Sequence, residues 1–555
     1  MNNGTYTKGS EVFTMSGNSE KTISGSSSTS MHNLSITNSG GVITKLGQLT
    51  ANALSISSGS KFTIDTVKAV TVTTNITNSA GVDGILIKSS SNRANGSLIF
   101  HNAAESPVPA TVEMYCKASR ATNYKWQFFG IPVQTLSASP TFDGGYVRKY
   151  NEAGIGTGYT SDKHWIQLVA GNTLTPFTGY EATQTAAKTF YFQGDLVNST
   201  YNSGQLAYTT GNPLIYTGQH LIGNPYTAAI DIKQLVFGNR TEASVYLYNT
   251  GSLAEWTSNS GISTPGNSPG QYTVATYNTA GVDGIPGQIP SMQAFLIKAM
   301  KDTVTATISI PYSSVVVKNA DLQRAPTMNK SASPEKIYTK IEVQGSRYGD
   351  RLWIFSDPTC TRNFDNGWDG YKFLGSLSVP QIFSIESDGY YQINGVDNID
   401  NSIIGFQKGE DSNYKLVFSH ENDESNYSKL YLIDLQEGTT TDITQSGTEY
   451  PFISTSSDPV NRFKIVTSLG VTTGNNKSID NNKLTISNLN QTFTVKNSTN
   501  LSGNLFIYDM SGRLVQKYEL TSNGEIKFET NLPVGLYNVQ ATTKNEIEKI
   551  TVLLR

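Results

Sequence analysis

Apolar and polar residues alternate in short runs along almost the whole chain. Runs of about four to eight residues, bounded by Gly, Asn, Ser or Pro, are typical of β-strands. The Gly, Ser, Thr and Asn residues that separate these runs disfavour long helices. Gly loses the most backbone entropy on folding, and the other three compete for backbone hydrogen bonds. The pattern predicts an all-β protein built from several modules.

The most regular pattern occupies residues 1–103. Its alternating runs begin at Asn33, Ala53, Val70, Ile85 and Ser97. Their starts lie 20, 17, 15 and 12 residues apart. This spacing favours β-solenoid-like repeats, in which each rung buries its apolar side chains against the next. A plain antiparallel β-sandwich, with strands about 8–12 residues apart, is the alternative.

Three further β modules are predicted after the repeats. Residues 104–317 form an aromatic-rich β domain that contains a GNPY turn, and residues 337–468 have the strand spacing of a β-sandwich. Residues 483–555 hold seven short strand-like runs, enough for a small Ig-like β-sandwich. Two polar segments, 318–336 and 468–482, are predicted to be linkers.

Composition narrows the functional classes. The 555 residues carry 41 Lys and Arg against 44 Asp and Glu, so the formal net charge is −3. This near-neutral balance argues against a nucleic-acid partner, which needs a concentrated basic face. The sequence contains no run of about 18 apolar residues, so it does not predict a transmembrane helix. Since the first residues do not resemble a signal peptide, we expect the natural protein to begin upstream.

The sequence predicts no catalytic residue. Its five histidines stand far apart, and neither a HExxH nor a GxSxG motif is present. Cys116 and Cys360 have no metal-binding spacing and are predicted to be buried free thiols, with a disulfide between modules as the alternative. No cofactor is predicted.

One acidic segment is a weak candidate for a structural Ca²⁺ site, because Ca²⁺ prefers several oxygen ligands in a Gly-containing loop. A hydrogen-bonded turn is the other interpretation. The candidate ligands are Asp357, Asp365, Asn366 and Asp369.

The end of the chain carries three ordered motifs: NLFIYDMSGRLV, LPVGLYNVQAT and KITVLLR. Together they resemble the type A C-terminal sorting domain of Bacteroidetes proteins exported by the type IX secretion system. The residues that match that pattern are Asp509, Gly512, Arg513, Pro533, Gly535, Tyr537, Lys549 and Arg555.

This resemblance implies that the outer-membrane type IX secretion machinery is a partner. The protein would be extracellular or attached to the outer-membrane surface, after cleavage and anchoring or after release. We therefore expect a non-catalytic, adhesin-like or structural surface protein, with a glycan or a host or cell-surface molecule as ligand. A secreted polysaccharide-active enzyme and a glycan-binding protein are the alternatives.

Overall fold

The chain forms two compact units, Met1–Leu469 and Gly470–Arg555, which are described separately. This computed structural model describes residues 1–4, 6–119, 125–154, 164–209, 217–251, 268–301, 306–316, 336–422, 427–468, 484–489, 492–497, 501–509, 513–522, 524–529, 532, 535–544 and 547–554. Apart from Lys336 and Ser468, the two predicted linkers lie outside these residues.

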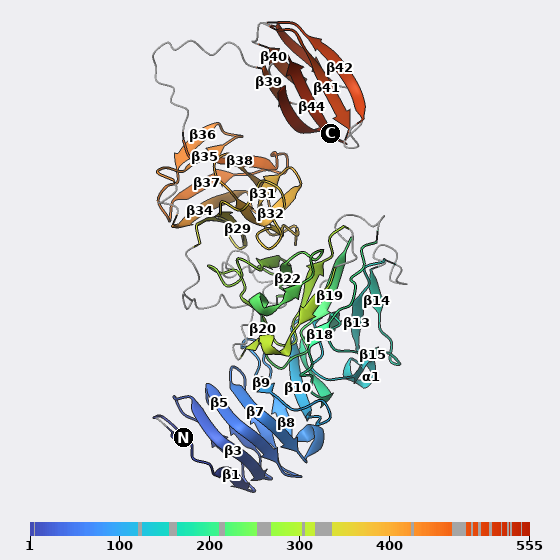
Figure 1. The fold of residues 1–555 in the computed structure, drawn as a ribbon, viewed down its shortest axis with the longest axis vertical. Coiled ribbons are helices and arrows are strands. Elements are labelled where there is room, and N and C mark those ends of the chain that lie inside the picture. Colours follow the sequence, from blue (N-terminus) through green and yellow to red (C-terminus); the bar gives the residue numbers. More distant parts are fainter. Residues whose placement is uncertain are drawn as a thin grey trace. The chain divides into compact units, whose positions relative to one another are not determined.

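The first unit begins with a β-solenoid, in which successive strands alternate between two parallel sheets (Figure 1). One sheet contains β1 (Val12–Gly17), β3 (Thr29–Asn38), β5 (Gln48–Ile56), β7 (Ala69–Asn78) and β9 (Ser97–Phe100). The other contains β2 (Lys21–Ile23), β4 (Val42–Thr44), β6 (Phe62–Ile64), β8 (Ile85–Ile87) and β10 (Pro109–Cys116), and β17 (Lys188–Asp195) joins it antiparallel to β10. Each turn of the chain thus adds one strand to each sheet, so the predicted solenoid is confirmed.

Equivalent apolar side chains stack from rung to rung inside the solenoid. Leu34 lies opposite Leu54, and Leu54 lies opposite Ile76. All three are buried. This stacking explains the sequence pattern, because every rung must supply an apolar residue at the same point of its turn. The solenoid core continues without a break into the side chains of β10 and β17.

The middle of the first unit consists of short, mostly antiparallel strands. One sheet contains β11 (Gln127–Phe129), β16 (Tyr180–Gln184), β13 (Gly145–Tyr150) and β14 (Trp165–Gln167), and another contains β19 (Gln219–Gly223), β25 (Ala294–Lys298), β22 (Ser244–Tyr248) and β23 (Tyr272–Thr276). Smaller sheets are formed by β12 (Leu136–Ser137) with β15 (Thr173–Leu174), by β18 (Tyr201–Asn202), β26 (Ile308–Ile310) and β21 (Val236–Phe237), and by β24 (Gln288–Ile289), β20 (Ala229–Asp231) and β27 (Val315–Val316).

Helical turns in the described residues are short. They are α1 (Ala138–Thr141), η1 (Gly81–Asp83), η2 (Ile232–Gln234) and η3 (Tyr312–Ser314). Within the described ranges, none of the helices has the length and apolar character needed to cross a membrane.

The first unit ends in an eleven-stranded sheet around a core of its own. Its strands are β28 (Tyr338–Gln344), β29 (Gly349–Ser356), β30 (Gly370–Tyr371), β31 (Gln381–Glu386), β32 (Gly389–Val396), β33 (Ser402–Gln407), β34 (Asn413–Glu421), β35 (Tyr431–Asp434), β36 (Thr439–Asp442), β37 (Glu449–Ile453) and β38 (Asn461–Val466). The Tyr450 ring of β37 meets the Phe463 ring of β38, although the two strands lie far apart in the strand order. The sheet therefore curls until its ends approach each other.

The second unit contains seven strands in two sheets around a small apolar core. One sheet contains β39 (Leu484–Leu489), β40 (Thr492–Asn497) and β43 (Gly524–Glu529). The other contains β42 (Leu514–Leu520), β41 (Gly503–Asp509), β44 (Gly535–Thr543) and β45 (Ile547–Leu554). With this unit, the predicted all-β fold class is confirmed for the described residues.

Candidate functional site

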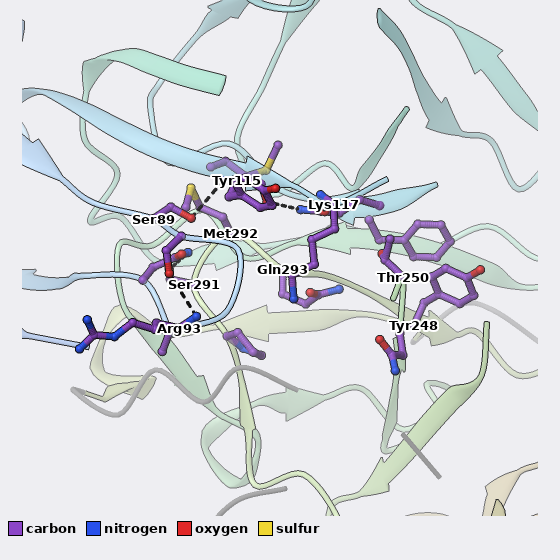
Figure 2. Close-up of a pocket in the computed structure, with 17 residues that line it drawn as sticks. Ser89, Arg93, Tyr115, Lys117, Tyr248, Thr250, Ser291, Met292 and Gln293 are labelled. Carbon is purple, nitrogen blue, oxygen red and sulfur yellow. Dashed lines mark hydrogen bonds between the residues drawn. The ribbon is translucent and has the colours of Figure 1, made fainter. Parts of the chain in front are cut away.

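A polar pocket of about 100 Å³ opens in the first unit beside the last rung of the solenoid (Figure 2). Its wall is built by the loop after β8, the end of β10, the start of β11, and the loops after β22 and β24. In Figure 2, Ser89 lies at the left, Lys117 and Gln293 lie near the centre, and Tyr248 lies at the right. Side chains more than 150 residues apart in the sequence therefore share this site.

The solenoid's geometry creates the first wall. β10 pairs with β8 only at Thr111 and Val112, so the rest of β10 faces the loop after β8. Ser89 of that loop accepts a hydrogen bond from the backbone N–H of Tyr115 at 3.0 Å. Glu113 secures the same loop, accepting a hydrogen bond from the Ser89 N–H at 3.1 Å and pairing with Lys88 at 3.0 Å. The loop replaces the neighbour that β10 lacks at this level.

A tight turn before β25 forms another part of the wall, beside the loop after β8. The N–H of Gln293 donates to the carbonyl of Pro290 at 3.1 Å, and Met292, between them, has a φ of 58°. A positive φ is uncommon for a residue other than Gly, and such conformations persist where surrounding contacts hold them. Here the carbonyl of Met292 accepts the N–H of Gly130 at 2.9 Å, next to β11. This contact holds the turn against the pocket wall.

The pocket carries positive charge and hydrogen-bonding groups without an acid or base. Arg93 and Lys117 supply the charge, hydroxyl and amide groups supply donors and acceptors, and Tyr248 supplies an aromatic face. Burial raises the pKa of Tyr248 to about 12, so its hydroxyl stays protonated at neutral pH. Among the described residues that line the pocket, none is Asp, Glu or His. The arrangement suits binding of a polar or anionic group rather than proton transfer.

The predicted calcium ligands lie in turns of the segment between β29 and β30, and each accepts backbone hydrogen bonds. Asp357 accepts the N–H of Thr359 at 2.9 Å, and Asp365 accepts that of Thr361 at 2.5 Å. The carboxylate of Asp369 accepts the N–H groups of Asp365 and Gly395, both at 2.6 Å. Burial raises the pKa of Asp369 to about 8.

Asn366, the fourth candidate, belongs to a joint within the first unit. Its side chain accepts the N–H of Ala243 at 2.7 Å and donates to the carbonyl of Thr241 at 3.1 Å. The segment before β30 is thereby tied to the loop that precedes β22. The part of the chain that the structure describes holds no group of three or more His, Cys, Asp or Glu side chains placed to bind a metal ion.

The motif residues of the second unit lie at the ends and in the middle of its strands. Asp509 ends β41 and lies opposite Tyr537 of β44, whose ring is buried in the core of the unit. Arg513 precedes β42, and Gly535 begins β44. Lys549 lies in β45 opposite Gln540. The motif residues outside the described part of the chain are Gly512, Pro533 and Arg555.

Both cysteines are free and buried, as the sequence predicts. Burial raises the pKa of the Cys116 thiol to about 11 and that of Cys360 to about 12. Both therefore remain protonated near neutral pH and are poor nucleophiles. The pocket itself was not predicted, because no local signal marks loops that meet only after long-range packing.

Comparison with known proteins gives two findings. A family model described as Domain of unknown function (DUF8693) matches residues 14–467. This range lies within the first unit and leaves out the second. Minor fimbrium subunit Mfa5 of Porphyromonas gingivalis is 34% identical over 413 residues, which make up 70% of this chain and 32% of that protein. The chain thus spans about a third of the length of this curated relative.

Proposed function

The chain belongs to the family described as Domain of unknown function (DUF8693), and from this premise we propose that it is a non-catalytic surface protein with an adhesin-like or structural role. The similarity to a minor fimbrium subunit is the observation that carries the proposal. An extracellular, surface-attached location follows from the same similarity. Assembly partners on the cell surface follow as well, because a subunit works within a larger structure.

The surroundings of the histidines support a non-catalytic role. Among the described residues, four of the five histidine rings bind main-chain or amide groups. His32 meets the amide of Asn52 at 2.9 Å, and His420 meets the carbonyl of Ile443 at 2.7 Å as well as the hydroxyl of Thr339 at 3.0 Å. His164 and His220 each meet a backbone carbonyl. All four rings are therefore held by contacts with main-chain or amide groups of the fold.

We further propose that the second unit is the export signal, recognised by the type IX secretion machinery. It is compact by itself and lies beyond the region that the family model matches. Its motif residues Asp509 and Tyr537 are neighbours across β41 and β44, so two of the three motifs are adjacent. A surface on these strands is a suitable recognition site for the machinery.

Deletion of residues 470–555 tests the export proposal. We expect the truncated protein to accumulate inside the cell, because the first unit retains its own cores and loses only the signal. Protease accessibility on intact cells measures the surface fraction. Lys429→Ala in the otherwise complete chain is the matched control, since it removes only an exposed ion pair. Undiminished surface delivery of the truncated chain would contradict the proposal.

The pocket supports a second candidate function, which is glycan binding. Hydroxyl, amide and aromatic groups together with Arg93 and Lys117 suit a sugar that carries an acidic group. We expect the double variant Arg93→Gln/Lys117→Gln to bind such a glycan about tenfold more weakly, because two charge-assisted contacts are lost. A glycan array followed by titration calorimetry measures the change.

The matched control for the pocket is Lys149→Gln, which alters an exposed lysine of β13 outside the pocket. It should leave glycan binding unchanged. Equal affinity of the double variant and the parent would remove the pocket from consideration. Cleavage of a bound polymer by the parent protein would instead contradict the non-catalytic role.

A further inference from the structure

A lysine and an aspartate meet in the interior of the eleven-stranded sheet. Asp350 is the second residue of β29, and Lys372 follows β30 directly. The Lys372 Nζ lies 2.5 Å from Oδ2 of Asp350, and the two side chains are 1% and 0% exposed. Water is therefore excluded from both charged groups.

The backbone fixes both residues before their side chains meet. Asp350 pairs with Val343 of the neighbouring strand β28. The N–H of Lys372 donates to the carbonyl of Tyr390 in β32 at 2.8 Å. Because both main chains are held by β structure, the side chains approach without the freedom of a surface ion pair.

The hydrogen bonding of this pair is incomplete. Oδ2 of Asp350 also accepts the N–H of Ile382 at 2.8 Å, whereas the buried Oδ1 has no hydrogen-bond partner. Among the residues that the structure describes, Asp350 is the hydrogen-bond partner of the Lys372 ammonium. An ammonium has three donors, and a carboxylate accepts about four hydrogen bonds. Burying both groups in this state is costly, because a buried ion pair is stable only when its remaining polar atoms are satisfied.

The other buried ion pair of this sheet differs. Arg462 is as deeply buried, but its guanidinium binds Asp434, Asp458 and the carbonyl of Ile453. A guanidinium is also never deprotonated in proteins and is not a nucleophile. Lys372 is different in kind, because burial lowers its pKa and favours the neutral amine.

We propose that Lys372 and Asp350 condense to form an intramolecular isopeptide bond. The ammonium first passes a proton to the carboxylate, where Oδ1 holds it, and this leaves a neutral amine beside a neutral acid. The amine nitrogen then attacks Cγ of Asp350, while the Ile382 N–H stabilises the charge that develops on Oδ2. Oδ1, which has no hydrogen-bond partner, leaves as water and takes one proton from the nitrogen besides the acid proton that it already holds. Overall, an ammonium and a carboxylate become an amide and a water molecule. The reaction needs no oxidant or other reactant.

The bond removes both buried charges and closes a covalent loop from residue 350 to residue 372. This loop contains Cys360 and the turn of Asp365, Asn366 and Asp369 that forms the joint with the loop before β22. A protein exposed outside the cell would gain resistance to unfolding and proteolysis at this joint. Loop closure stabilises a fold in the same way when a disulfide provides it.

Peptide mapping of the purified full-length protein tests the proposal. Trypsin cuts after Arg347, Arg351, Arg362 and Lys408 but not after a lysine whose amine is an amide. The expected digest contains residues 348–351 joined to residues 363–408, with the mass of one water missing. A mass lower by one water is not sufficient evidence by itself. Asp369 precedes Gly370, and an Asp-Gly pair can cyclise with loss of the same mass. The joined peptide is therefore the decisive product.

Two controls make the mapping specific. Lys340 and Asp283, 2.9 Å apart but 14% and 25% exposed, should stay unlinked, and trypsin should cut after Lys340. In Lys372→Arg the joined peptide should disappear. If that variant does not fold, the wild-type digest still decides the matter. A complete cut after Lys372 with a free 348–351 peptide in the wild-type protein would overturn the proposal.

Discussion

Replacing Arg462 by Met is expected to destabilise the first unit by about 3–5 kcal/mol, since the change leaves buried carboxylates without their cation. Nε and Nη2 of Arg462 lie 3.2 and 3.1 Å from Oδ2 of Asp434, whose side chain is 0% exposed. Nη1 binds Asp458 at 3.0 Å and the carbonyl of Ile453 at 2.7 Å. Met fills much of the same volume but satisfies none of these acceptors.

This arginine matters for the fold because it joins the two ends of the curled sheet. Asp434 ends β35 and Arg462 lies in β38, whereas Ile453 ends β37 at the opposite end of the strand order. Tyr450 of β37 also donates to Asp434 at 3.0 Å. Losing the arginine should therefore separate β37 from β38 and open the sheet.

Urea denaturation followed by tryptophan fluorescence measures this effect. The matched control is Lys429→Ala, which breaks a 2.7 Å ion pair with Asp442 whose two side chains are about half exposed. Exposed pairs contribute about 0–1 kcal/mol, so the control should move the midpoint little. If Arg462→Met behaved like this control, the guanidinium would not be what holds the sheet closed.

The sequence predicts the features of this fold that depend on residues close together in the chain, and not those that depend on contacts between distant residues. The solenoid and the seven strands of the second unit were predictable, because local alternation reflects side chains that point alternately in and out of a sheet. The curl of the eleven-stranded sheet was not, since it depends on a contact between Tyr450 and Phe463 that pairs no adjacent strands. No local pattern in the sequence reveals the strand order of a large sheet.

The same limit applies to the candidate sites. Ser89 and Gln293 share a pocket through packing of loops that are about 200 residues apart in the chain. Asp350 and Lys372 are closer, but neither lies in a recognisable motif, and their burial shows only in the folded sheet. The acidic segment was predicted to be either a Ca²⁺ site or a hydrogen-bonded turn, and its contact with another loop through Asn366 depends on backbone groups that no sequence pattern reveals.

The same joint should make the stability of the first unit depend on pH. Glu242 is buried beside β22, and burial raises its pKa to about 7. The Tyr246 hydroxyl donates to its carboxyl group and accepts the N–H of Tyr371 at 3.0 Å. The ammonium group of Lys298 also acts on Glu242 and partly offsets the effect of burial. An unfolded glutamate has a pKa of about 4.3, so the folded state binds the proton more tightly.

The direction of the pH effect follows from proton linkage. The stability contributed by protonated Glu242 is fully present below about pH 4 and is lost as pH rises toward 7. One pKa unit corresponds to about 1.4 kcal/mol, so the loss is of the order of 4 kcal/mol. Asp369, with a pKa of about 8, extends the decline to that pH. We therefore expect the free energy of unfolding to fall from acidic to mildly alkaline pH.

Glu242→Gln separates the contribution of this residue from that of Asp369. Gln keeps a carbonyl that accepts the Tyr246 hydroxyl but carries no ionisable proton. The variant should therefore lose much of the decline between about pH 4 and pH 7 and be more stable than the parent at pH 8. Asp369→Asn should act over the wider range that extends to about pH 8. Parallel stability–pH curves for Glu242→Gln and the parent would mean that Glu242 has the same pKa in the folded and unfolded states, with Lys298 offsetting the whole effect of burial.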